Sequence, residues 1–571
     1  MRKIKKFIPI LLLLFIFLVR ELSVINKTSI IDDETVHIFS GYSIVKTHTY
    51  SSQSAHPPLC KILAGLAILH LHPRLPSFIH RNFNRWIDGE WIEGEHFFFK
   101  NKSEINQILF WARLPIVFLA IILGLFIFLW SNELYGYYAG LFSLFLFTFD
   151  PNILANSGLV TTDLGVSLFI FITIYIFYKY LSKPGKLLLG LFGLSLGLAL
   201  ATKFTTPVLV PPALLLICLF LLTRKEYKDR IPIIKKQVFS LYGLLSIIII
   251  PLFVLSAFYM FIHTGDFFRG LYNIVFAGAL IGNHVSFLNG VFSMNGFRAY
   301  FIFAFLYKTP IAFIIMFLLT LFFIEKIEDR EYVLFIPVII LFILGAMSKL
   351  QLGIRYILPI YPFLYVFAGK LVPSIMKRQW KWKIIVSGLI IWYGWTSIMI
   401  SPNYISYFNR FAQGPNNGWK YLIDSNIDWG QDLKGLKVFL KENGNPPVIL
   451  SYFGSIDPTI YGIKYQPLLM AKYPDARLYT NTRPQKEYLA VSVNNLQGLM
   501  FPPQLRDIFN WLKPIQPVAK AGYSIFIYNI TDSIYIREHL YDMYMMTVHP
   551  NEAKVQQETV NNIILQQIHG K

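Results

Sequence analysis

Apolar runs of about twenty residues recur through the first 400 positions of the chain, and they constrain its fold more than any other feature. Each run is long enough to cross a hydrocarbon core about 30 Å thick as an α-helix. The composition agrees, because 55% of the 571 residues are hydrophobic and only 15% are charged, whereas soluble domains carry about 25% charged residues. The sequence therefore predicts a polytopic α-helical membrane protein.

The apolar runs predict about eleven membrane spans. The first follows a basic start, "MRKIKK", and no small-x-small cleavage site follows it, so an uncleaved helix is expected rather than a signal peptide. Several runs are short or join at Gly and Pro. The spans are expected near residues 7–25, 108–130, 137–150, 164–181, 187–202, 204–223, 238–262, 297–324, 332–348, 354–373 and 383–401.

Lysine and arginine gather in four segments, and under this count all four lie on one side of the membrane: "MRKIKK", "KYLSKPGK", "TRKEYKDRIPIIKK" and "MKRQWKWK". Short basic loops typically face the cytoplasm. We therefore expect a cytoplasmic N-terminus in the plasma (inner) membrane, with the loop 26–107 and the tail outside. Membrane topology accounts for the net charge of +20, so no nucleic-acid partner is expected.

The chain changes character near residue 402, where turns and shorter apolar runs replace the long helices. The segments "PVILSYFG", "EYLAVSV" and "YSIFIYNI" alternate as strands do, and "DLKGLKVFLKEN" has helical periodicity. We expect a transmembrane domain over 1–401 and a small extracytoplasmic α/β domain over 402–571.

Two acidic sites converge on the predicted outer face. The stretch "IIDDETVH" places Asp32, Asp33 and Glu34 just outside the first span, and "TTD" places Asp163 at the start of the fourth. Other interpretations stay open: Asp163 is suited to capping a helix, because a helix N-terminus favours a carboxylate, and the acidic triplet suits a solvated loop end.

Basic residues are predicted at a similar depth. Lys203 lies in a break between two spans, Arg355 lies at the mouth of another, and Lys349 and Lys308 are set nearby. A charge at membrane depth is costly, about 2.5–3.5 kcal/mol or more, so such residues usually face a polar cavity. Snorkelling to the headgroups is the alternative, above all for Lys349.

The sequence gives weaker evidence for a metal site, or for a binding role of the tail, than for the acidic and basic positions above. His37 and His56 belong to no strong ligand motif, although a divalent cation beside Asp33 and His37 is a hypothesis. In the tail, "DSNIDWGQD" sets Asp424 and Asp428 on a predicted loop, where they could contact the acceptor, bind calcium or simply form turns. No cofactor is required by the sequence, which has no glycine-rich nucleotide loop.

These residues resemble the GT-C superfamily of integral-membrane glycosyltransferases, in the branch of protein O-mannosyltransferases and lipid A aminoarabinose transferases. The resemblance covers most of the membrane part, and the tail segments "YLIDSNIDWGQDL" and "LAVSVNNLQG" look like those of bacterial relatives. The chain departs from the family pattern in two ways. It lacks the long luminal domain of eukaryotic mannosyltransferases, and it has His56 where aminoarabinose transferases have lysine. The matching elements are Asp33-Glu34, "HPPL" from His56, "TTD" with Asp163, "TKFT" with Lys203, and "GIRYILPIYPF" with Arg355.

The resemblance implies an inverting transfer of a sugar from a polyprenyl phosphate to a hydroxyl of a protein or glycolipid acceptor outside the membrane. It implies Asp33 as general base, with Glu34 and Asp163 positioning it or the substrates. Lys203 and Arg355 would neutralise the leaving phosphate. The sugar, the acceptor and the metal requirement stay open, as do a lipid-linked glycan flippase and a polyprenyl-diphosphate glycan ligase.

Overall fold

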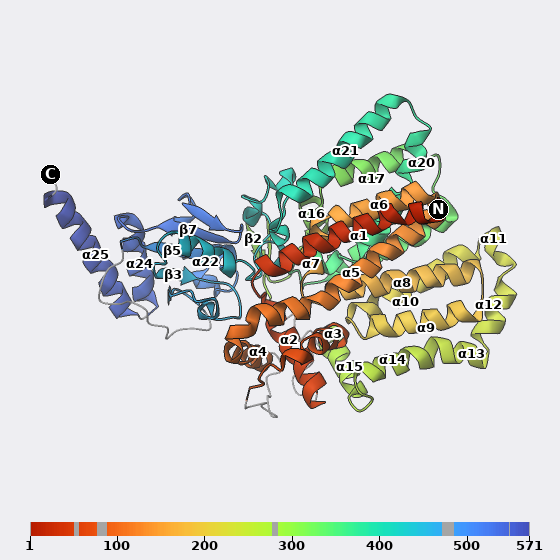
Figure 1. Cartoon of the computed structure of the whole chain (residues 1–571), viewed down its shortest axis with the longest axis horizontal. Helices are drawn as coiled ribbons and strands as arrows, with labels where there is room; N and C mark the ends of the chain where they lie inside the picture. Colours follow the sequence, from red (N-terminus) through yellow and green to blue (C-terminus); the bar gives the residue numbers. More distant parts are fainter. Residues whose placement is uncertain are drawn as a thin grey trace.

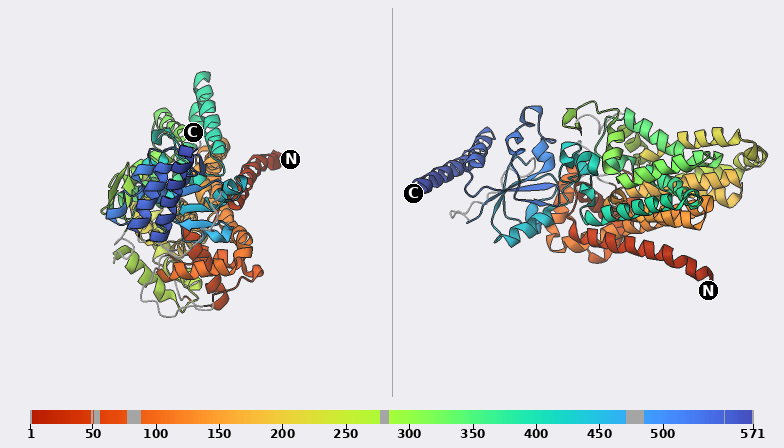
Figure 2. Two further views of the ribbon diagram at one scale, coloured as in Figure 1. Left: turned by 90° about the vertical axis from the view of Figure 1, so that its left-hand side faces the viewer. Right: turned by 90° about the horizontal axis from the view of Figure 1, so that it is seen from above.

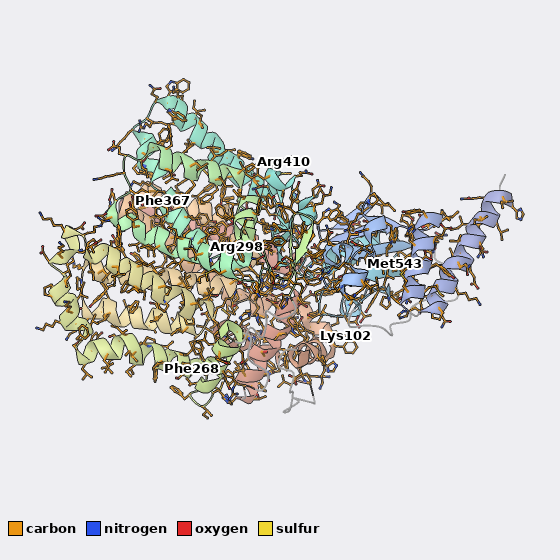
Figure 3. All side chains as sticks on the ribbon, turned by 180° about the vertical axis from the view of Figure 1, so that it is seen from behind. Lys102, Phe268, Arg298, Phe367, Arg410 and Met543 are labelled. Carbon is orange, nitrogen blue, oxygen red and sulfur yellow. The ribbon has the colours of Figure 1, made fainter. Side chains whose placement is uncertain are left out.

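The fold has two parts placed end to end, a helix bundle and a tail built around a β-sheet (Figure 1). It is taken from a computed structural model, which describes residues 2–48, 50, 56–76, 88–276, 284–470, 485–547 and 549–569. In the view from behind, the labelled Phe367 lies within the bundle and the labelled Met543 lies in the tail (Figure 3).

Apolar sequence gives the bundle several long helices that run nearly parallel (Figure 1). Helix α1 lies along the outside of the bundle (Figure 2), and only 28% of its apolar window is buried. The helices are α1 (Arg2–Lys27), α5 (Ile105–Tyr135), α6 (Tyr137–Phe149), α7 (Pro151–Ser157), α8 (Asp163–Ser182), α9 (Lys186–Leu200), α10 (Thr205–Leu222), α11 (Lys225–Lys228), α12 (Ile231–Val238), α13 (Leu241–Leu244), α14 (Ile250–Phe258), α15 (Thr264–Leu271), α16 (Tyr300–Lys308), α17 (Ile311–Phe323), α18 (Tyr332–Met347), α19 (Ile360–Ala368), α20 (Leu371–Met376) and α21 (Trp380–Met399).

The predicted count of about eleven spans is not confirmed. Within the described part of the chain, six helices are long and apolar enough to cross a membrane, or eight if two bent pairs each count as one span. The run 297–324 is broken before Pro310, where α16 and α17 meet at 106°, and α6 and α7 meet at 63° before Pro151. The runs 187–202 and 354–373 form shorter helices. Within the second run, prolines lie at the start of α19 and Gly369 separates α19 from α20.

The basic segments gather at one end of the bundle. The N-terminus, α11, α12 and the turn from α20 to α21 all lie at the end away from the sheet (Figure 1). The α8 helix begins at the other end, so its first residue, Asp163, faces the tail. The bundle therefore separates lysine-rich turns from the acidic positions by the length of its helices.

Three helices before α5 cover the tail-facing end of the bundle: α2 (Asp32–Thr47), α3 (Leu59–Ala67) and α4 (Asp88–Lys100). Helix α3 forms the first part of the short apolar segment 59–71. Its backbone lies directly on α2, because a Cβ on Gly41 would lie 1.8 Å from the carbonyl oxygen of Lys61, and one on Gly65 would meet the backbone of Gly41. Glycine at these positions allows the close approach.

The tail contains the five-stranded sheet β4-β3-β5-β7-β6, in which β3 pairs in parallel with β4 and β5 while β7 is antiparallel to β5 and β6. The predicted strands and helix are present as β3, β5, β7 and α22. The bounds are β3 (Val448–Ser451), β4 (Tyr465–Pro467), β5 (Tyr488–Ser492), β6 (Ala519–Ala521), β7 (Ile525–Asn529), α22 (Leu433–Glu442), α23 (Val493–Gln497), α24 (Ile534–Met546) and α25 (Pro550–His569), with a separate hairpin, β1 (Ser286–Leu288) and β2 (Val291–Ser293), earlier in the chain.

Lys308 links the bundle to the tail through two hydrogen bonds. This residue ends α16 and is 1% exposed. Its ammonium group donates to the backbone carbonyl oxygens of Ile405 at 2.7 Å and Asn426 at 2.6 Å, and it lies 4.4 Å from the centre of the Phe408 ring. A buried ammonium needs such acceptors, so Lys308 is satisfied by the tail backbone.

Candidate active site

Asp33 stands in the first turn of α2 and forms an ion pair with Arg355. The helix starts with Asp32, Asp33 and Glu34, where the exposed backbone N–H groups favour negative charge. Asp33 Oδ2 accepts a hydrogen bond of 2.6 Å from Arg355 Nη1. Its side chain is 18% exposed and that of Arg355 is 9% exposed, so the pair lies in a largely enclosed place and the solvated-loop interpretation does not apply to Asp33.

Asp163 forms a second ion pair, with Lys203. It opens α8, and its Oδ1 lies 2.5 Å from Lys203 Nζ. Helix α8 has no side-chain cap, so Asp163 faces the lysine rather than the helix N–H groups. Lys203 follows α9, and its ammonium lies 4.8 Å from the centre of the Tyr356 ring.

Arg355 joins the two pairs. It lies in the short 3-10 helix η6 (Ile354–Ile357), and its Nη1 is 3.7 Å from Asp163 Oδ2 as well as bonded to Asp33. Its guanidinium carbon lies 4.1 Å from the centre of the Trp429 ring. Arg355 Nε is buried and has no hydrogen-bond partner among the described residues. The two predicted acids and the two predicted cations therefore meet in one cluster.

Glu34 faces away from this cluster and binds Arg113 of α5. Its two carboxylate oxygens accept from Arg113 Nε at 2.8 Å and Nη2 at 2.6 Å, and both side chains are fully buried. The same carboxylate accepts from the backbone N–H groups of Val160 and Ile31. Glu34 therefore joins α2, α5 and the turn that precedes Asp163, and it does not face the cluster of Asp33 and Arg355.

Arg113 was not identified from the sequence, although it lies within the predicted span 108–130. Its Nη1 and Nη2 also donate to the backbone oxygens of Ile25 and Ser29 at the end of α1. The signal that identifies it is the one that identified Arg355, a charged residue within an apolar run.

Two histidines and Lys61 lie on the α3 side of the cluster. His37 Nδ1 is 2.7 Å from the carbonyl oxygen of Val160, and its ring lies 5.7 Å from that of His56. Burial and the Lys61 charge lower the pKa of His37 to about 4. Burial and the charge of Lys203 hold the pKa of His56 well below its usual range. Both rings are therefore neutral at physiological pH.

The tail loop from Asp424 to Gln431 closes the site from the other side. The Asp32 N–H donates to the Trp429 carbonyl at 3.0 Å, and the Ser29 N–H donates to the Gln431 carbonyl at 2.8 Å. Asp428 is fully buried and accepts from the backbone N–H groups of Gly430 and Asn494. Asp428 therefore serves the folding of the loop, as the turn interpretation expects, while Asp424 is half-buried next to Arg355.

The metal hypothesis gains no support from the side-chain arrangement. Among the described residues, no three His, Cys, Asp or Glu side chains are grouped so that they could hold a metal ion. Asp33, which the hypothesis paired with His37, is bonded to Arg355 instead. Lys349, for which snorkelling to the headgroups and a role in a polar cavity were both left open, is exposed.

Apolar spanning helices and a cluster of ion-paired carboxylates at one end of them define an integral membrane protein with an enclosed polar site. Over residues 104–255 the sequence matches the family described as dolichyl-phosphate-mannose-protein mannosyltransferase. This match confirms the resemblance to GT-C glycosyltransferases noted from the motifs. No curated protein sequence matches the chain.

A comparison with solved structures gives two further similarities. ArnT from Cupriavidus metallidurans matches with TM-score 0.48 and 11% identity in the apo state, and with 0.49 and 10% when bound to undecaprenyl phosphate; each covers 91% of this chain and 97% of that chain. The oligosaccharyltransferase AglB from Archaeoglobus fulgidus, in complex with an inhibitory peptide and a dolichol-phosphate, matches with TM-score 0.41 and 13% identity over 69% of this chain and 56% of its own.

Proposed function

We propose that the protein is an inverting glycosyltransferase that moves a sugar from a polyprenyl phosphate to a hydroxyl of a protein or glycolipid. One observation carries this proposal: a single guanidinium, Arg355, lies between the carboxylates of Asp33 and Asp163, and Lys203 lies on the far side of Asp163. Such a cluster provides cations for a phosphate beside carboxylates for a sugar.

Arg355 is able to hold a phosphate without releasing Asp33. An arginine has five N–H donors, and the bond to Asp33 uses only Nη1. Within the described part of the chain the Nε donor is buried with no partner, and a buried donor is stabilised when it gains an acceptor. A phosphate oxygen is the acceptor that a guanidinium binds most readily, so Arg355 and Lys203 are assigned to the phosphate.

The donor is assigned from the family and from the position of the site. The description of the matched family names a dolichyl-phosphate sugar. The cluster lies where α2, α8 and the segment before α19 reach the end of an apolar bundle, within reach of a lipid headgroup. A membrane-anchored sugar phosphate suits this position.

The reaction is assigned to the extracytoplasmic face. The lysine-rich turns lie at the opposite end of the bundle (Figure 1), and such turns usually face the cytoplasm. The N-terminus is then cytoplasmic, and the sheet-containing tail lies outside together with the site.

The chemistry is a single displacement. The acceptor oxygen forms a bond to the anomeric carbon, the bond from that carbon to the phosphate oxygen breaks, and the electron pair leaves with the phosphate. Lys203 and Arg355 stabilise the charge that develops there. Asp33 and Asp163 place negative charge beside the positive charge that grows on the sugar. A carboxylate takes the acceptor proton, a role that the family resemblance implies for Asp33.

The test uses purified protein in liposomes with tritiated polyprenyl-phosphate mannose, and the glucose donor in parallel. We expect transfer, or slow donor hydrolysis, that falls at least about 100-fold in Asp33→Asn, because general-base and electrostatic contributions of this kind are typically that large. Asp507→Asn is the matched control, since Asp507 is exposed in the tail. Equal turnover by the Asp33 variant and the control contradicts the proposal.

A further inference from the structure

A groove of about 480 Å³ lies where α17 and α21 meet the first segment of the tail. Pockets that bind small molecules commonly measure about 300–1,000 Å³. Arg410, which lines the groove, lies near the junction of the bundle and the tail (Figure 3). Among the described residues that line the groove, none belongs to the cluster around Arg355. The groove is therefore a second candidate binding site.

The wall of the groove on the bundle side is apolar. Trp392, Trp395 and Met399 line it and are 42%, 59% and 62% exposed. Their spacing of three and four residues places them on one face of α21. Large apolar side chains exposed together mark a membrane-interaction surface, and tryptophan is enriched at the level of the lipid headgroups. This wall therefore suits the acyl chains of a lipid close to its headgroup.

The wall on the tail side is polar and positively charged. Arg410 lines the groove and is exposed. Lys520 Nζ donates to the carbonyl oxygen of Asn416, another lining residue, at 3.3 Å and to its Oδ1 at 3.1 Å. Burial and the charge of Lys420 lower the pKa of Lys520, so a third cation lies close by. Within the described part of the chain, none of the three cations forms an ion pair, and a basic rim of this kind attracts an anion.

We propose that the groove binds one membrane phospholipid with an anionic headgroup. Its acyl chains lie against Trp392 and Trp395, and its phosphate is held by Arg410, since a guanidinium donates to two phosphate oxygens at once. The surrounding positive charge favours an anionic headgroup over a zwitterionic one. A polyprenyl phosphate also joins a phosphate to an apolar chain, but its phosphate is assigned to Arg355 and Lys203. The phospholipid is a different ligand from the sugar donor, so the inference goes beyond the proposed function.

The groove lies on the segment that joins the tail to the bundle. Asn409, a lining residue, donates from Nδ2 to the Thr309 carbonyl oxygen at 2.7 Å and from its backbone N–H to the Tyr307 carbonyl oxygen at 2.9 Å. The ring of Phe408, which also lines the groove, contacts the ammonium of Lys308. A lipid that touches α21 and this segment adds contacts across the joint. Because a ligand of the folded state stabilises that state, bound phospholipid raises the unfolding temperature.

The test measures lipid binding to the purified full-length protein in detergent micelles. Native mass spectrometry and thermal unfolding give the Kd for phosphatidylglycerol, phosphatidylcholine, polyprenyl phosphate and glycerol 3-phosphate. We expect phosphatidylglycerol to raise the unfolding temperature and to bind about 10-fold more tightly than phosphatidylcholine, because only the first has a net negative charge. Glycerol 3-phosphate lacks the acyl chains, so it is expected to give no shift.

Two variants separate the phosphate contact from the acyl-chain contact. Arg410→Gln is expected to raise the Kd for phosphatidylglycerol about 10–100-fold, which corresponds to the loss of one charged hydrogen bond. Thr396→Trp fills the groove, which Thr396 lines, and weakens binding without changing any charge. Lys554→Gln is the matched control, because Lys554 is 75% exposed in α25. It removes one positive charge away from the groove and is expected to keep the wild-type Kd.

The proposal is overturned if phosphatidylglycerol binds the wild-type protein and both groove variants with the same Kd. Phosphatidylcholine that binds as tightly as phosphatidylglycerol overturns the anionic headgroup, and glycerol 3-phosphate that does so overturns a lipid occupant. If Arg410→Gln weakens the binding of polyprenyl phosphate but not that of phosphatidylglycerol, the groove belongs to the sugar donor instead. Donor turnover does not enter these measurements, so failure of the proposed function is detected separately.

Discussion

The buried pair of Glu34 and Arg113 offers the sharpest test of how the site is held. Arg113→Met removes two charge-assisted hydrogen bonds of 2.8 and 2.6 Å to Glu34 while keeping an apolar stem in α5. It also releases the backbone oxygens of Ile25 and Ser29. Glu34 keeps only the N–H groups of Val160 and Ile31, so a carboxylate that is 0% exposed loses its counter-ion.

The expected cost is about 3–5 kcal/mol, the typical loss when one partner of a buried ion pair is removed. Activity falls too, because Glu34 is next to Asp33 in α2 and Val160 is in the turn before Asp163. The measurement is thermal and denaturant unfolding in detergent, together with donor turnover. The double variant Glu34→Gln/Arg113→Met lacks the uncompensated Glu34 carboxylate charge, so it is expected to be more stable than Arg113→Met alone.

The matched control is Lys179→Met. Lys179 pairs with Glu133 at 2.8 Å, but both side chains are 35% exposed, and exposed pairs contribute only about 0–1 kcal/mol. The reasoning is refuted if Arg113→Met and Lys179→Met lower stability equally, or if the double variant is less stable than the wild-type protein by the sum of both single effects.

Two further substitutions test the phosphate and the helix packing. Arg355→Lys replaces the guanidinium, which holds Asp33 through Nη1 and has an Nε without a partner among the described residues, by a single ammonium group. The Kd for polyprenyl phosphate is expected to rise about 10–100-fold, which corresponds to the loss of one charged hydrogen bond. An unchanged Kd removes Arg355 from the phosphate site. Gly41→Ala places a Cβ 1.8 Å from the Lys61 carbonyl oxygen, whereas the Cβ of Gly388→Ala meets nothing within 4 Å. Gly41→Ala is therefore expected to lower stability and turnover, and Gly388→Ala is expected to leave both unchanged. Equal behaviour of the two variants contradicts the close packing of α2 on α3.

The charged positions of the site were predictable because charge inside apolar sequence is costly and rarely accidental. That argument found Lys203 and Arg355, and it applies equally to Arg113, which was overlooked. The sequence could not show in which direction each of these side chains points. Asp33 and Glu34 are neighbours in α2, and successive helical residues point about 100° apart, so one faces Arg355 while the other faces Arg113.

Helix breaks and distant contacts limited the rest. Pro310 and Pro151 stand where the bent pairs break, but apolar composition alone merged α16 with α17 into one predicted span. Trp429 packs against Arg355, which lies in a separate part of the chain. Such a contact depends on how the tail folds back on the bundle, and periodicity contains no information about it.

The bundle holds the tail through hydrogen bonds to main-chain oxygens of the tail. Lys308 binds two carbonyl oxygens, and the N–H groups of Ser29 and Asp32 bind two more. Main-chain atoms are common to every amino acid, so substitutions on the outward side of the tail leave these anchors untouched. Sequence changes there can alter what the outer part of the tail contacts while the cluster of Asp33, Asp163, Lys203 and Arg355 stays as it is.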